Sequence, residues 1–320
     1  MSSLPVCAIL DDYQNAAFAV ADWSALEERV ELRRFGAHLG GEEEVAAALQ
    51  GVEVVVAMRE RTPFPASLFA RLPDLKQLIT TGARNRSIDL EAARAHGVLV
   101  THTRSAGNPA AELAWAGMLA ALRNIPAEVQ NFRDGGPWQQ GLGRSADGKR
   151  LGILGLGKLG AKCARFGQTF GMEVAGWTRT DLPARAEALG IMPLPLEQLF
   201  ETSDVVMIQM SLVPETRGFV TPELLALMKP DALLVNTSRG PIVDEPALIA
   251  ALEAGRIGGA VLDVFGTEPL PQDHPFRRLT NVLPTPHIGY VTEENYRVYY
   301  ADAVENIVAW LDGAPIRVMG

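Results

Sequence analysis

The sequence predicts an α/β fold built on parallel sheets, and three observations support that class. Short apolar runs alternate with longer amphipathic segments along the chain, as strand–helix–strand units require. Several runs are apolar throughout instead of alternating, which is typical of parallel strands covered on both faces. The length of 320 residues suggests about two domains. We therefore expect two doubly wound α/β units.

Ten segments are expected to be strands and seven to be helices. The strands are expected over residues 6–10, 52–58, 75–80, 98–101, 151–154, 174–177, 205–210, 232–235, 259–264 and 282–283. The helices are expected over residues 42–49, 90–96, 109–123, 159–170, 222–227, 245–253 and 293–311. Pro109 behind Asn108 is a suitable helix start, and this long helix is expected to run from one domain into the next. A glycine-rich, polar stretch, 134–148, then precedes a new strand, and the last helix is expected to return to the first domain.

Composition argues against several classes of partner and location. Thirty-eight acidic residues against 29 Lys and Arg give a net charge of −9, which makes binding to nucleic acid or an anionic membrane improbable. No apolar run reaches the ~18 residues that a membrane span needs, and the first residues lack the basic segment of a signal peptide. Cys7 and Cys163 lie far apart without metal-ligand spacing. We expect free thiols, a reducing cytoplasmic compartment and no bound metal.

A glycine-rich turn follows the expected strand 151–154 and opens the next helix. It reads Gly155-Leu156-Gly157-Lys158-Leu159-Gly160, a GxGxxG spacing that is strong evidence only between a strand and a helix. Gly155 permits the tight turn, Gly157 has no Cβ to block a pyrophosphate, and Gly160 lets the helix pack close to the strand. The helix N-terminus offers N–H groups and partial positive charge to phosphates. We expect a dinucleotide to bind here, with all six residues as candidate contacts.

The end of the following strand indicates which dinucleotide is preferred. NAD sites usually carry an acidic residue there, about 20 residues on, for the ribose 2′-hydroxyl. Here Thr178 occupies the expected acidic position and Arg179 follows it. A guanidinium and hydroxyl groups favour a 2′-phosphate, which a carboxylate would repel. We expect NADP to be favoured over NAD unless Asp181 points inward; the alternative for Arg179 is a solvated loop charge.

Three further motifs each follow a strand in the second half of the chain. They read Val235-Asn236-Thr237-Ser238-Arg239-Gly240, Leu262-Asp263-Val264-Phe265-Gly266-Thr267-Glu268-Pro269 and Leu283-Pro284-Thr285-Pro286-His287-Ile288-Gly289. Doubly wound sheets bind ligands at the carboxyl ends of their strands. Alone, each charged residue has an ordinary explanation as a surface charge, a turn acid or a loop histidine. Together, Arg239, Glu268 and His287 supply the cation, carboxylate and imidazole that reduction of a carbonyl group needs.

With these motifs in this order, the chain resembles the D-isomer-specific 2-hydroxyacid dehydrogenases over nearly its whole length. The resemblance implies two Rossmann-like domains, a nucleotide-binding domain of residues 102–288 inserted into a split substrate domain of residues 1–101 and 289–320. It implies that His287 is the general acid/base, that Glu268 orients it and that Arg239 anchors the substrate. It also implies that Asp263 lies near the nicotinamide carboxamide, and Thr237 is a further candidate for cofactor binding.

The chemistry of these side chains agrees with those roles. When hydride reaches the carbonyl carbon of a 2-oxo acid, negative charge builds on the oxygen, and a protonated His287 can neutralise it by proton transfer. Such acid–base help is worth roughly 10²–10⁴-fold in rate. Glu268 favours the charged form of the imidazole, and the planar fork of Arg239 can grip the substrate carboxylate.

The first domain departs from the family pattern at the turn that usually holds the substrate carboxylate. Family members usually have Gly-x-Gly-x-Asp there, with backbone N–H groups as the anchor. This chain reads Thr81-Gly82-Ala83-Arg84-Asn85-Arg86, so Arg84 replaces the second Gly and Arg86 replaces the Asp. The two cations indicate either a larger or more acidic substrate or loop charges paired with Asp89 or Glu60. The candidate substrate-binding residues are Arg59, Thr81, Gly82, Ala83, Arg84 and Arg239.

The leading hypothesis is an NAD(P)-dependent reductase of small 2-oxo acids such as glyoxylate, hydroxypyruvate or pyruvate analogues. One alternative is a nucleotide-sensing, corepressor-like protein with little turnover, which the complete Arg239–Glu268–His287 set argues against. Another is a formate, phosphite or phosphoglycerate dehydrogenase on the same fold. No long regulatory segment follows Gly320, which disfavours an elaborated serine-pathway enzyme. The family usually forms homodimers, with Trp115 and Trp138 as candidate contacts; core packing is the alternative for both.

Overall fold

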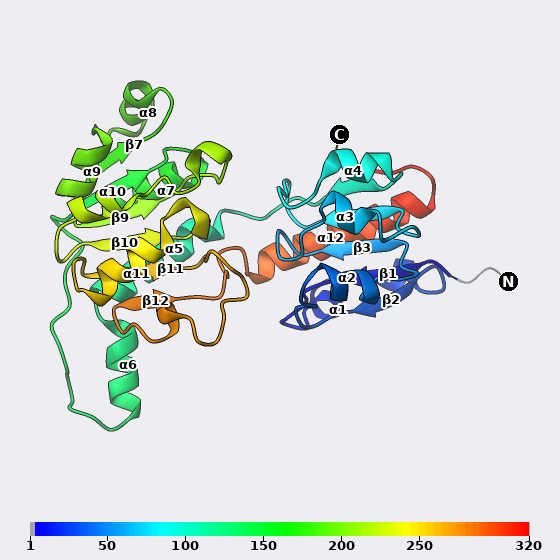
Figure 1. The fold of residues 1–320 in the computed structure, drawn as a ribbon, viewed down its shortest axis with the longest axis horizontal. Coiled ribbons are helices and arrows are strands. Elements are labelled where there is room, and N and C mark those ends of the chain that lie inside the picture. Colours follow the sequence, from blue (N-terminus) through cyan, green and yellow to red (C-terminus); the bar gives the residue numbers. More distant parts are fainter. Residues whose placement is uncertain (1–3, 320) are drawn as a thin grey trace. The chain divides into compact units, whose positions relative to one another are not determined.

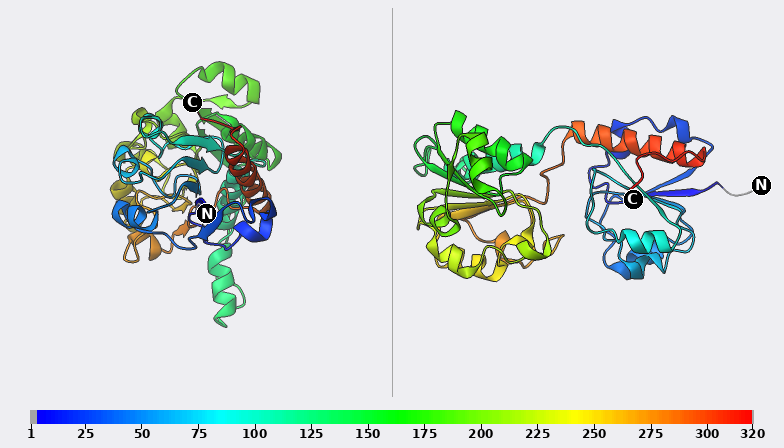
Figure 2. Two further views of the ribbon diagram at one scale, coloured as in Figure 1. Left: turned by 90° about the vertical axis from the view of Figure 1, so that its right-hand side faces the viewer. Right: turned by 90° about the horizontal axis from the view of Figure 1, so that it is seen from above.

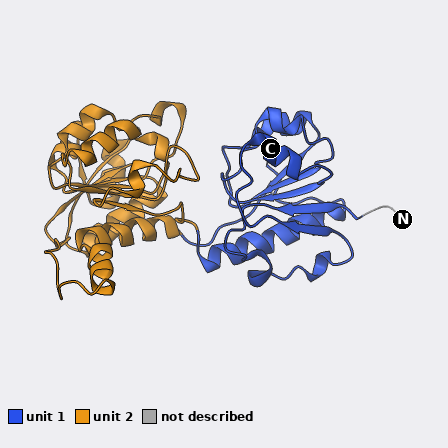
Figure 3. Ribbon diagram, turned by 60° about the horizontal axis from the view of Figure 1, so that its bottom comes forward, with its two compact units in different colours: residues 1–107, 291–320 blue, residues 108–290 orange. Residues whose placement is uncertain are grey.

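The chain folds into two compact α/β units in a computed structural model that describes residues 4–319. One, the split unit, holds residues 4–107 and 291–319, and the other, the inserted unit, holds residues 108–290 (Figure 3). The sequence placed these divisions after residue 101 and after residue 288. Residues 1–3, on which the argument against a signal peptide partly rests, lie outside the described range.

The split unit is built on a five-stranded parallel sheet with the strand order β2-β1-β3-β4-β5 (Figure 1). The inner strands are almost wholly buried, whereas the edge strand β2 is mostly exposed. The sequence of β2 is Glu-Leu-Arg-Arg, and charged residues at an edge protect a sheet from pairing with another chain. The strands are β1 (Val6–Ile9), β2 (Glu31–Arg34), β3 (Val54–Ala57), β4 (Gln77–Thr80) and β5 (Leu99–His102).

Helices cover both faces of this first sheet. Helices α2 (Glu42–Ala48), α3 (Ala66–Phe69) and α4 (Leu90–Ala95) share one apolar core with the strands. The long C-terminal helix α12 (Glu293–Leu311) runs beside the sheet and contacts β4 and α1 (Ala17–Val20) (Figure 2). Its Asn306 donates to Thr101 Oγ1 at 3.3 Å and to the His102 carbonyl at 3.0 Å. The short 3-10 helix η1 spans Ser24–Leu26.

The inserted unit is built on a seven-stranded parallel sheet with the order β12-β11-β10-β9-β6-β7-β8. The order reverses between β6 and β9, which is the topological switch point of a doubly wound sheet. The strands are β6 (Arg150–Leu154), β7 (Glu173–Trp177), β8 (Met192–Pro193), β9 (Val205–Ile208), β10 (Leu233–Asn236), β11 (Gly259–Leu262) and β12 (Val282–Pro284).

The strands of this second sheet other than the exposed β8 contribute to two cores, because successive side chains point to opposite faces. In β9, Val205 and Met207 belong to the core with α5 and α7, whereas Val206 and Ile208 belong to the core with α9, α10 and α11. Burial on both faces explains why the run is apolar at every position. The helices are α5 (Pro109–Leu122), α6 (Ile125–Arg133), α7 (Lys158–Thr169), α8 (Leu182–Leu189), α9 (Leu196–Thr202), α10 (Pro222–Leu227) and α11 (Glu245–Glu253), with 3-10 helices η2 (Pro214–Thr216), η3 (Gly240–Ile242) and η4 (Pro275–Arg277).

The expectation that the helix from Pro109 runs from one domain into the next is wrong. This helix, α5, belongs to the inserted unit, and the chain crosses through residues 103–108. There the amides of Arg104 and Ala106 donate to Asp302 and Asn295 of α12, each at 2.7 Å, so they are unavailable to a helix. Gly107 follows with a φ of +60°, which also breaks helical geometry.

The two tryptophans considered as dimer contacts have different environments. Trp115 is 7% exposed, belongs to the core with α5 and α7, and packs edge-on against the half-exposed Phe170. Trp138 is 82% exposed and stacks edge-on with Phe132 of α6 at 6.0 Å between ring centroids. It lies in the stretch 134–149, which has no helix or strand, as its glycine content predicts. None of the helices described is both long and apolar enough to cross a membrane.

Candidate active site

The three motif loops follow three neighbouring strands of the second sheet. Arg239 follows β10, Glu268 follows β11 and His287 follows β12, and these strands are adjacent in the order β12-β11-β10. Parallel strands end at the same edge, so the order of the sheet brings the loops together. All three residues belong to the inserted unit.

His287 and Glu268 form a direct hydrogen-bonded pair. The His287 Nδ1 lies 2.5 Å from Glu268 Oε2, and the other carboxylate oxygen, Oε1, accepts from the Phe265 amide at 2.9 Å. Their side chains are 18% and 31% exposed. Because Nδ1 donates to the carboxylate, the imidazole is oriented and its Nε2 is left for exchange of a proton.

Asp263 holds the loop that carries His287. Its side chain is 1% exposed. Oxygen Oδ1 accepts from Thr285 Oγ1 at 2.6 Å and from the Ile288 amide at 2.8 Å, and Oδ2 accepts from the Gly289 amide at 2.8 Å. Burial raises the pKa of the Asp263 carboxyl above its usual range, while these donors and the nearby imidazole oppose the rise. His287, with a φ of +53°, is therefore held in a left-handed conformation by bonds on both sides.

Arg239 lies on a segment that packs directly against the glutamate loop. A Cβ added at Gly240 would lie 2.1 Å from the backbone carbon of Phe265, so only glycine permits this approach. The turn is fixed by Asn236, whose side chain donates to the Arg239 carbonyl at 3.0 Å and accepts from the Ser238 amide at 3.0 Å. Arg239 Nη1 donates to the Ser238 carbonyl at 2.6 Å. Arg239 and the His287–Glu268 pair thus lie on loops that follow neighbouring strands, and the loops of Arg239 and Glu268 pack directly against each other.

The glycine-rich turn has the geometry that a dinucleotide requires. Gly155 has a φ of +104°, and a Cβ there would lie 2.5 Å from the Gln209 carbonyl oxygen. A Cβ at Gly160 would lie 2.0 Å from the Gly155 carbonyl oxygen, whereas one at Gly157 meets nothing within 4 Å. Gly157 is the residue before the first turn of α7, where N–H groups are free for phosphates. The turn therefore fits a pyrophosphate, and Lys158 and Leu159 belong to that first helical turn.

Strand β7, whose end is expected to determine the choice between NAD and NADP, is not followed directly by a carboxylate. Thr178 is partly buried, and Arg179 Nη1 lies 3.7 Å from Glu215 Oε2 on η2. Asp181 is exposed, before α8. Arg185 of α8 donates to the Leu156 carbonyl at 3.3 Å, which places a second guanidinium at the glycine-rich turn. Sequence spacing did not identify Arg185 or Glu215, because their proximity to the turn and to Arg179 depends on tertiary structure.

The remaining cofactor candidate from the first motif is enclosed by protein. Thr237 is 7% exposed, and its Oγ1 accepts from Gln209 Nε2 at 3.4 Å. Gln209 follows β9 beside the glycine-rich turn, since its carbonyl oxygen approaches Gly155. Thr237 is therefore linked to the turn through one side chain.

Three candidate substrate residues of the split unit, Arg59, Thr81 and Gly82, lie against one another. The Arg59 amide donates to Thr81 Oγ1 at 2.9 Å, and Arg59 Nη1 would meet a Cβ on Gly82 at 1.8 Å. Ala83 and Arg84 follow Gly82 and are exposed. The structure thus brings Arg59 onto the turn after β4, as expected for residues that follow adjacent strands.

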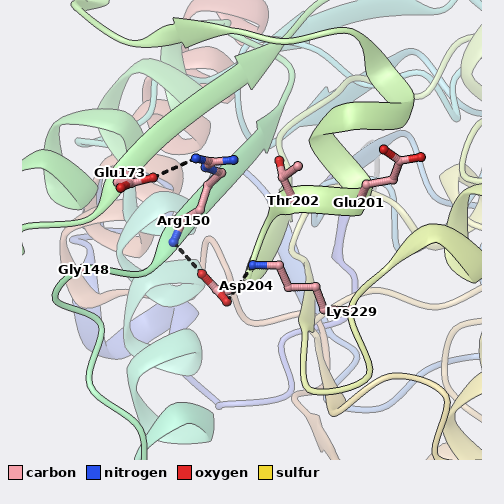
Figure 4. Close-up of a pocket in the computed structure, with 7 residues that line it drawn as sticks. All are labelled: Gly148, Arg150, Glu173, Glu201, Thr202, Asp204 and Lys229. Atoms are coloured by element: carbon pink, nitrogen blue, oxygen red, sulfur yellow. Dashed lines mark hydrogen bonds and ion pairs between the residues drawn. The ribbon is translucent and has the colours of Figure 1, made fainter.

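A shallow depression lies at the amino ends of the strands of the second sheet, at the opposite end of the strands from the motif loops. It is lined by Gly148, Arg150, Glu173, Glu201, Thr202, Asp204 and Lys229 (Figure 4). Two of its three acids are paired with its two cations: Arg150 pairs with Glu173 at 2.8 Å, and Lys229 pairs with Asp204 at 3.0 Å. Partial burial opposes ionisation of Asp204, but bonds from the Arg150 amide and Lys229 hold its pKa below the usual range. Within residues 4–319, no group of three or more His, Cys, Asp or Glu could hold a metal ion.

Comparisons with known proteins agree with this geometry. Residues 115–289 match the family described as D-isomer specific 2-hydroxyacid dehydrogenase, NAD binding domain. A D-3-phosphoglycerate dehydrogenase of Mycobacterium bovis is 35% identical over 97% of this chain and 58% of its own length. A glyoxylate reductase of Aeropyrum pernix is 37% identical over 77% of this chain and 76% of its own length.

A solved structure shares the fold over nearly the whole chain. The phosphoglycerate oxidoreductase of Vibrio cholerae superposes with a TM-score of 0.90 at 35% identity, covering 98% of this chain and all of that one. The chain spans about half the length of the D-3-phosphoglycerate dehydrogenases it matches, from 47% to 58%.

Proposed function

The chain belongs to the D-isomer specific 2-hydroxyacid dehydrogenase family, and from this premise we propose that it interconverts a small 2-oxo acid and its D-2-hydroxy acid with a nicotinamide cofactor. The observation that carries the proposal is the His287–Glu268 pair, 2.5 Å apart, in the unit that also holds the glycine-rich turn. Arg239 on the adjacent loop completes the set of groups that carbonyl reduction needs.

The protein's part of the reaction is proton transfer and charge stabilisation. A nicotinamide dinucleotide whose pyrophosphate is held at the glycine-rich turn would supply the hydride for C2 of the 2-oxo acid, or accept it in the reverse direction. His287, protonated, donates from Nε2 to the developing alkoxide oxygen and recovers the proton in reverse. Glu268 stabilises the imidazolium and keeps its ring oriented. Arg239 binds the substrate carboxylate through its planar fork.

Different residues are assigned to the pyrophosphate, to the nicotinamide end and to the adenosine end of the dinucleotide. The turn of Gly155, Leu156, Gly157, Lys158, Leu159 and Gly160 binds the pyrophosphate, and Thr237 and Asp263 are assigned to the nicotinamide end. Three of the roughly four acceptor positions of the Asp263 carboxylate serve the His287 loop, which leaves one for a carboxamide. At the adenosine end, we propose a preference for NADP, since Thr178 and Arg179 replace the usual carboxylate and Arg185 adds a cation.

The split unit contributes to substrate binding through Arg59, Thr81, Gly82, Ala83 and Arg84. Their position at the carboxyl ends of β3 and β4 supports this role. Both cysteines are free and buried, which suits the expected reducing, cytoplasmic location.

We also propose that the protein forms a homodimer through α6 and the stretch that follows it. Five large apolar side chains are exposed there, at 41–96% of their surface: Ile125, Val129, Phe132, Trp138 and Leu142. Such a concentration is unusual for a monomer and marks an interaction surface. Sedimentation of the wild type and of Trp138→Ser tests it, and a monomeric wild type would refute it.

The activity is tested by following the near-ultraviolet absorbance of the reduced nicotinamide. NADPH and NADH are offered in parallel with glyoxylate, hydroxypyruvate and pyruvate, with His287→Ala as the control. We expect oxidation that depends on His287 and is faster with NADPH. Binding of nucleotide without turnover of any acid would favour the nucleotide-sensing alternative.

A further inference from the structure

The loops that follow β3 and β4 in the split unit are strongly basic in a chain whose net charge is −9, although the segment after the neighbouring strand β1 carries Asp11 and Asp12. Residues 58–62 follow β3 and residues 81–87 follow the neighbouring strand β4. Together these two loops carry the four arginines 59, 61, 84 and 86 but one acid, Glu60. A local excess of positive charge concentrates anions, and parallel sheets bind ligands at the carboxyl ends of their strands. The two loops are therefore suited to an anionic group.

The turn after β4 differs from a backbone cradle for anions. The Gly82 amide, which a cradle would offer to a ligand, donates instead to Thr103 Oγ1 at 2.7 Å. The space above Gly82 is taken by the guanidinium of Arg59, with Nη1 1.8 Å from where a Cβ would lie. Recognition at this turn consequently depends on guanidinium groups more than on that amide.

Asn85 fixes the shape of the turn and leaves its arginines on the outside. It is 5% exposed, and its amide donates to the Arg59 carbonyl at 2.6 Å and to Thr80 Oγ1 at 2.9 Å. Its oxygen accepts from the Ser87 amide at 2.8 Å. Arg84 and Arg86, one on each side of this buried residue, are exposed.

The two acids considered as partners for these arginines have other contacts. Glu60 lies 3.7 Å from Arg59 Nε. Asp89 caps α4 by accepting from the Ala92 amide at 2.9 Å. The turn therefore presents Arg84 on a rigid frame, with its most obvious neutralising groups engaged by neighbours.

We propose that the split unit binds a second anionic group of the substrate, with Arg84 as its principal contact. The inference rests on the proposed dehydrogenase function and narrows its substrates to 2-oxo acids that carry a further carboxylate or a phosphate. A monoacid brings one carboxylate, for which Arg239 is already proposed. Because Arg59 already lies 3.7 Å from Glu60, the guanidinium of Arg84 is the charge that exceeds what the single carboxylate needs, and a second anion accounts for it.

The test compares acids that have the same number of chain carbons and differ in one anionic group. Initial rates are measured for 2-oxoglutarate against 2-oxopentanoate, and for 3-phosphohydroxypyruvate against hydroxypyruvate, so that carboxylate and phosphate are distinguished. The proteins are the wild type, Arg84→Gln, Arg84→Lys and the control Arg94→Gln, which removes an exposed cation from the last turn of α4.

We expect the wild type to prefer one of the two acids that carry a second anionic group. Arg84→Gln should lower that acid's kcat/KM about tenfold more than that of its monoacid, because a hydrogen bond to a charged group is lost. Arg84→Lys should recover part of the loss, and Arg94→Gln should change neither value. The KM of the preferred acid should also rise with salt in the wild type, since attraction between exposed charges is screened.

Two results would overturn the proposal. If the wild type prefers the monoacids, or if Arg84→Gln lowers both members of a pair equally, the second subsite is wrong and the dehydrogenase function stands. If no acid is reduced, calorimetric titrations of the NADP-loaded protein with 2-oxoglutarate and with 3-phosphohydroxypyruvate still decide. Binding of either acid that Arg84→Gln weakens supports the subsite although the reaction has failed. Binding that Arg84→Gln leaves unchanged, or no binding of either acid, refutes it.

Discussion

Replacing Asp263 by asparagine tests how the loop that carries His287 is held. The amide oxygen can still accept from Thr285 and Ile288, but the amide nitrogen would face the Gly289 N–H, which now lies 2.8 Å from Oδ2. Losing that bond and leaving a buried donor unsatisfied costs about 1–3 kcal/mol. Removing the buried charge offsets part of this cost, because burial raises the pKa of Asp263. We expect a net loss of about 0–2 kcal/mol, a fall of a few degrees in Tm.

The raised pKa also fixes the direction of the pH dependence. The folded protein binds the Asp263 proton more tightly than the unfolded chain does. Wild-type stability from this group is therefore greatest below the unfolded pKa and declines as pH rises through the folded pKa. The Asp263→Asn protein should lack that decline, which thermal melts over acidic to neutral pH would show.

The effect on catalysis should exceed the effect on stability. Asp263 anchors Thr285, Ile288 and Gly289, on both sides of His287, so relaxing the loop displaces the imidazole. A displacement of ~1 Å can cost ~10²-fold in rate, and we expect kcat to fall about 10–100-fold. The assay is steady-state turnover at saturating cofactor, so that weaker cofactor binding does not lower the measured kcat.

A matched control is Asp204, which lies at the amino ends of the strands of the same sheet. Asp204 accepts from the Arg150 amide at 2.7 Å and from Lys229 at 3.0 Å. Asp204→Asn should lose comparable stability and retain kcat. If Asp263→Asn keeps kcat within about twofold of the wild type, or if Asp204→Asn lowers it equally, the reasoning about the loop is refuted.

Three further predictions concern the proton donor, the cofactor and the thiols. His287→Ala should lower turnover about 10²–10⁴-fold with cofactor affinity near that of the wild type; normal turnover would remove it from the acid–base role. Arg179→Asp should shift preference from NADPH toward NADH, and Glu215→Gln should tighten NADPH binding because Glu215 competes for Arg179; fluorescence titrations measure both, and unchanged affinities would contradict them. Burial raises the pKa of Cys7 and Cys163 to about 12, so an aromatic disulfide reagent at neutral pH should label them only after denaturation. Rapid labelling of the folded protein would show that one of them is accessible.

The sequence predicted the buried strands because parallel strands covered on both faces leave a continuous apolar signal. All ten expected segments overlap a strand. The GxGxxG turn was identifiable because Gly155 and Gly160 have steric requirements that no other residue meets. The pairing of His287 with Glu268 could be anticipated only through the resemblance, since the two residues lie 19 positions apart.

Other parts of the structure left no comparable signal. The edge strand β2 is polar, β8 has two residues, and α1 and α3 have four each, which is too short for a periodic pattern. The exposed helix α6 is a different case: it has no buried face, but Ile125, Val129 and Phe132 recur at helical spacing, so it could have been predicted. The bond from the Gly82 amide to Thr103 joins residues on neighbouring strands, and no local rule predicts it.

The way the proposed catalytic groups are held explains how substrate choice could change without loss of chemistry. Glu268 is bound by the Phe265 amide, and Asp263 by the Ile288 and Gly289 amides, so their positions follow from backbone bonds among adjacent loops of one sheet. The arginines of the turn after β4 are exposed side chains on a frame that Asn85 fixes through other atoms. Substituting Arg84 therefore alters the charge presented to a ligand while every bond that orients His287 remains in place. Loops on a rigid scaffold commonly carry specificity in this way, which is why the matched-acid comparison in Arg84 variants separates substrate choice from catalysis.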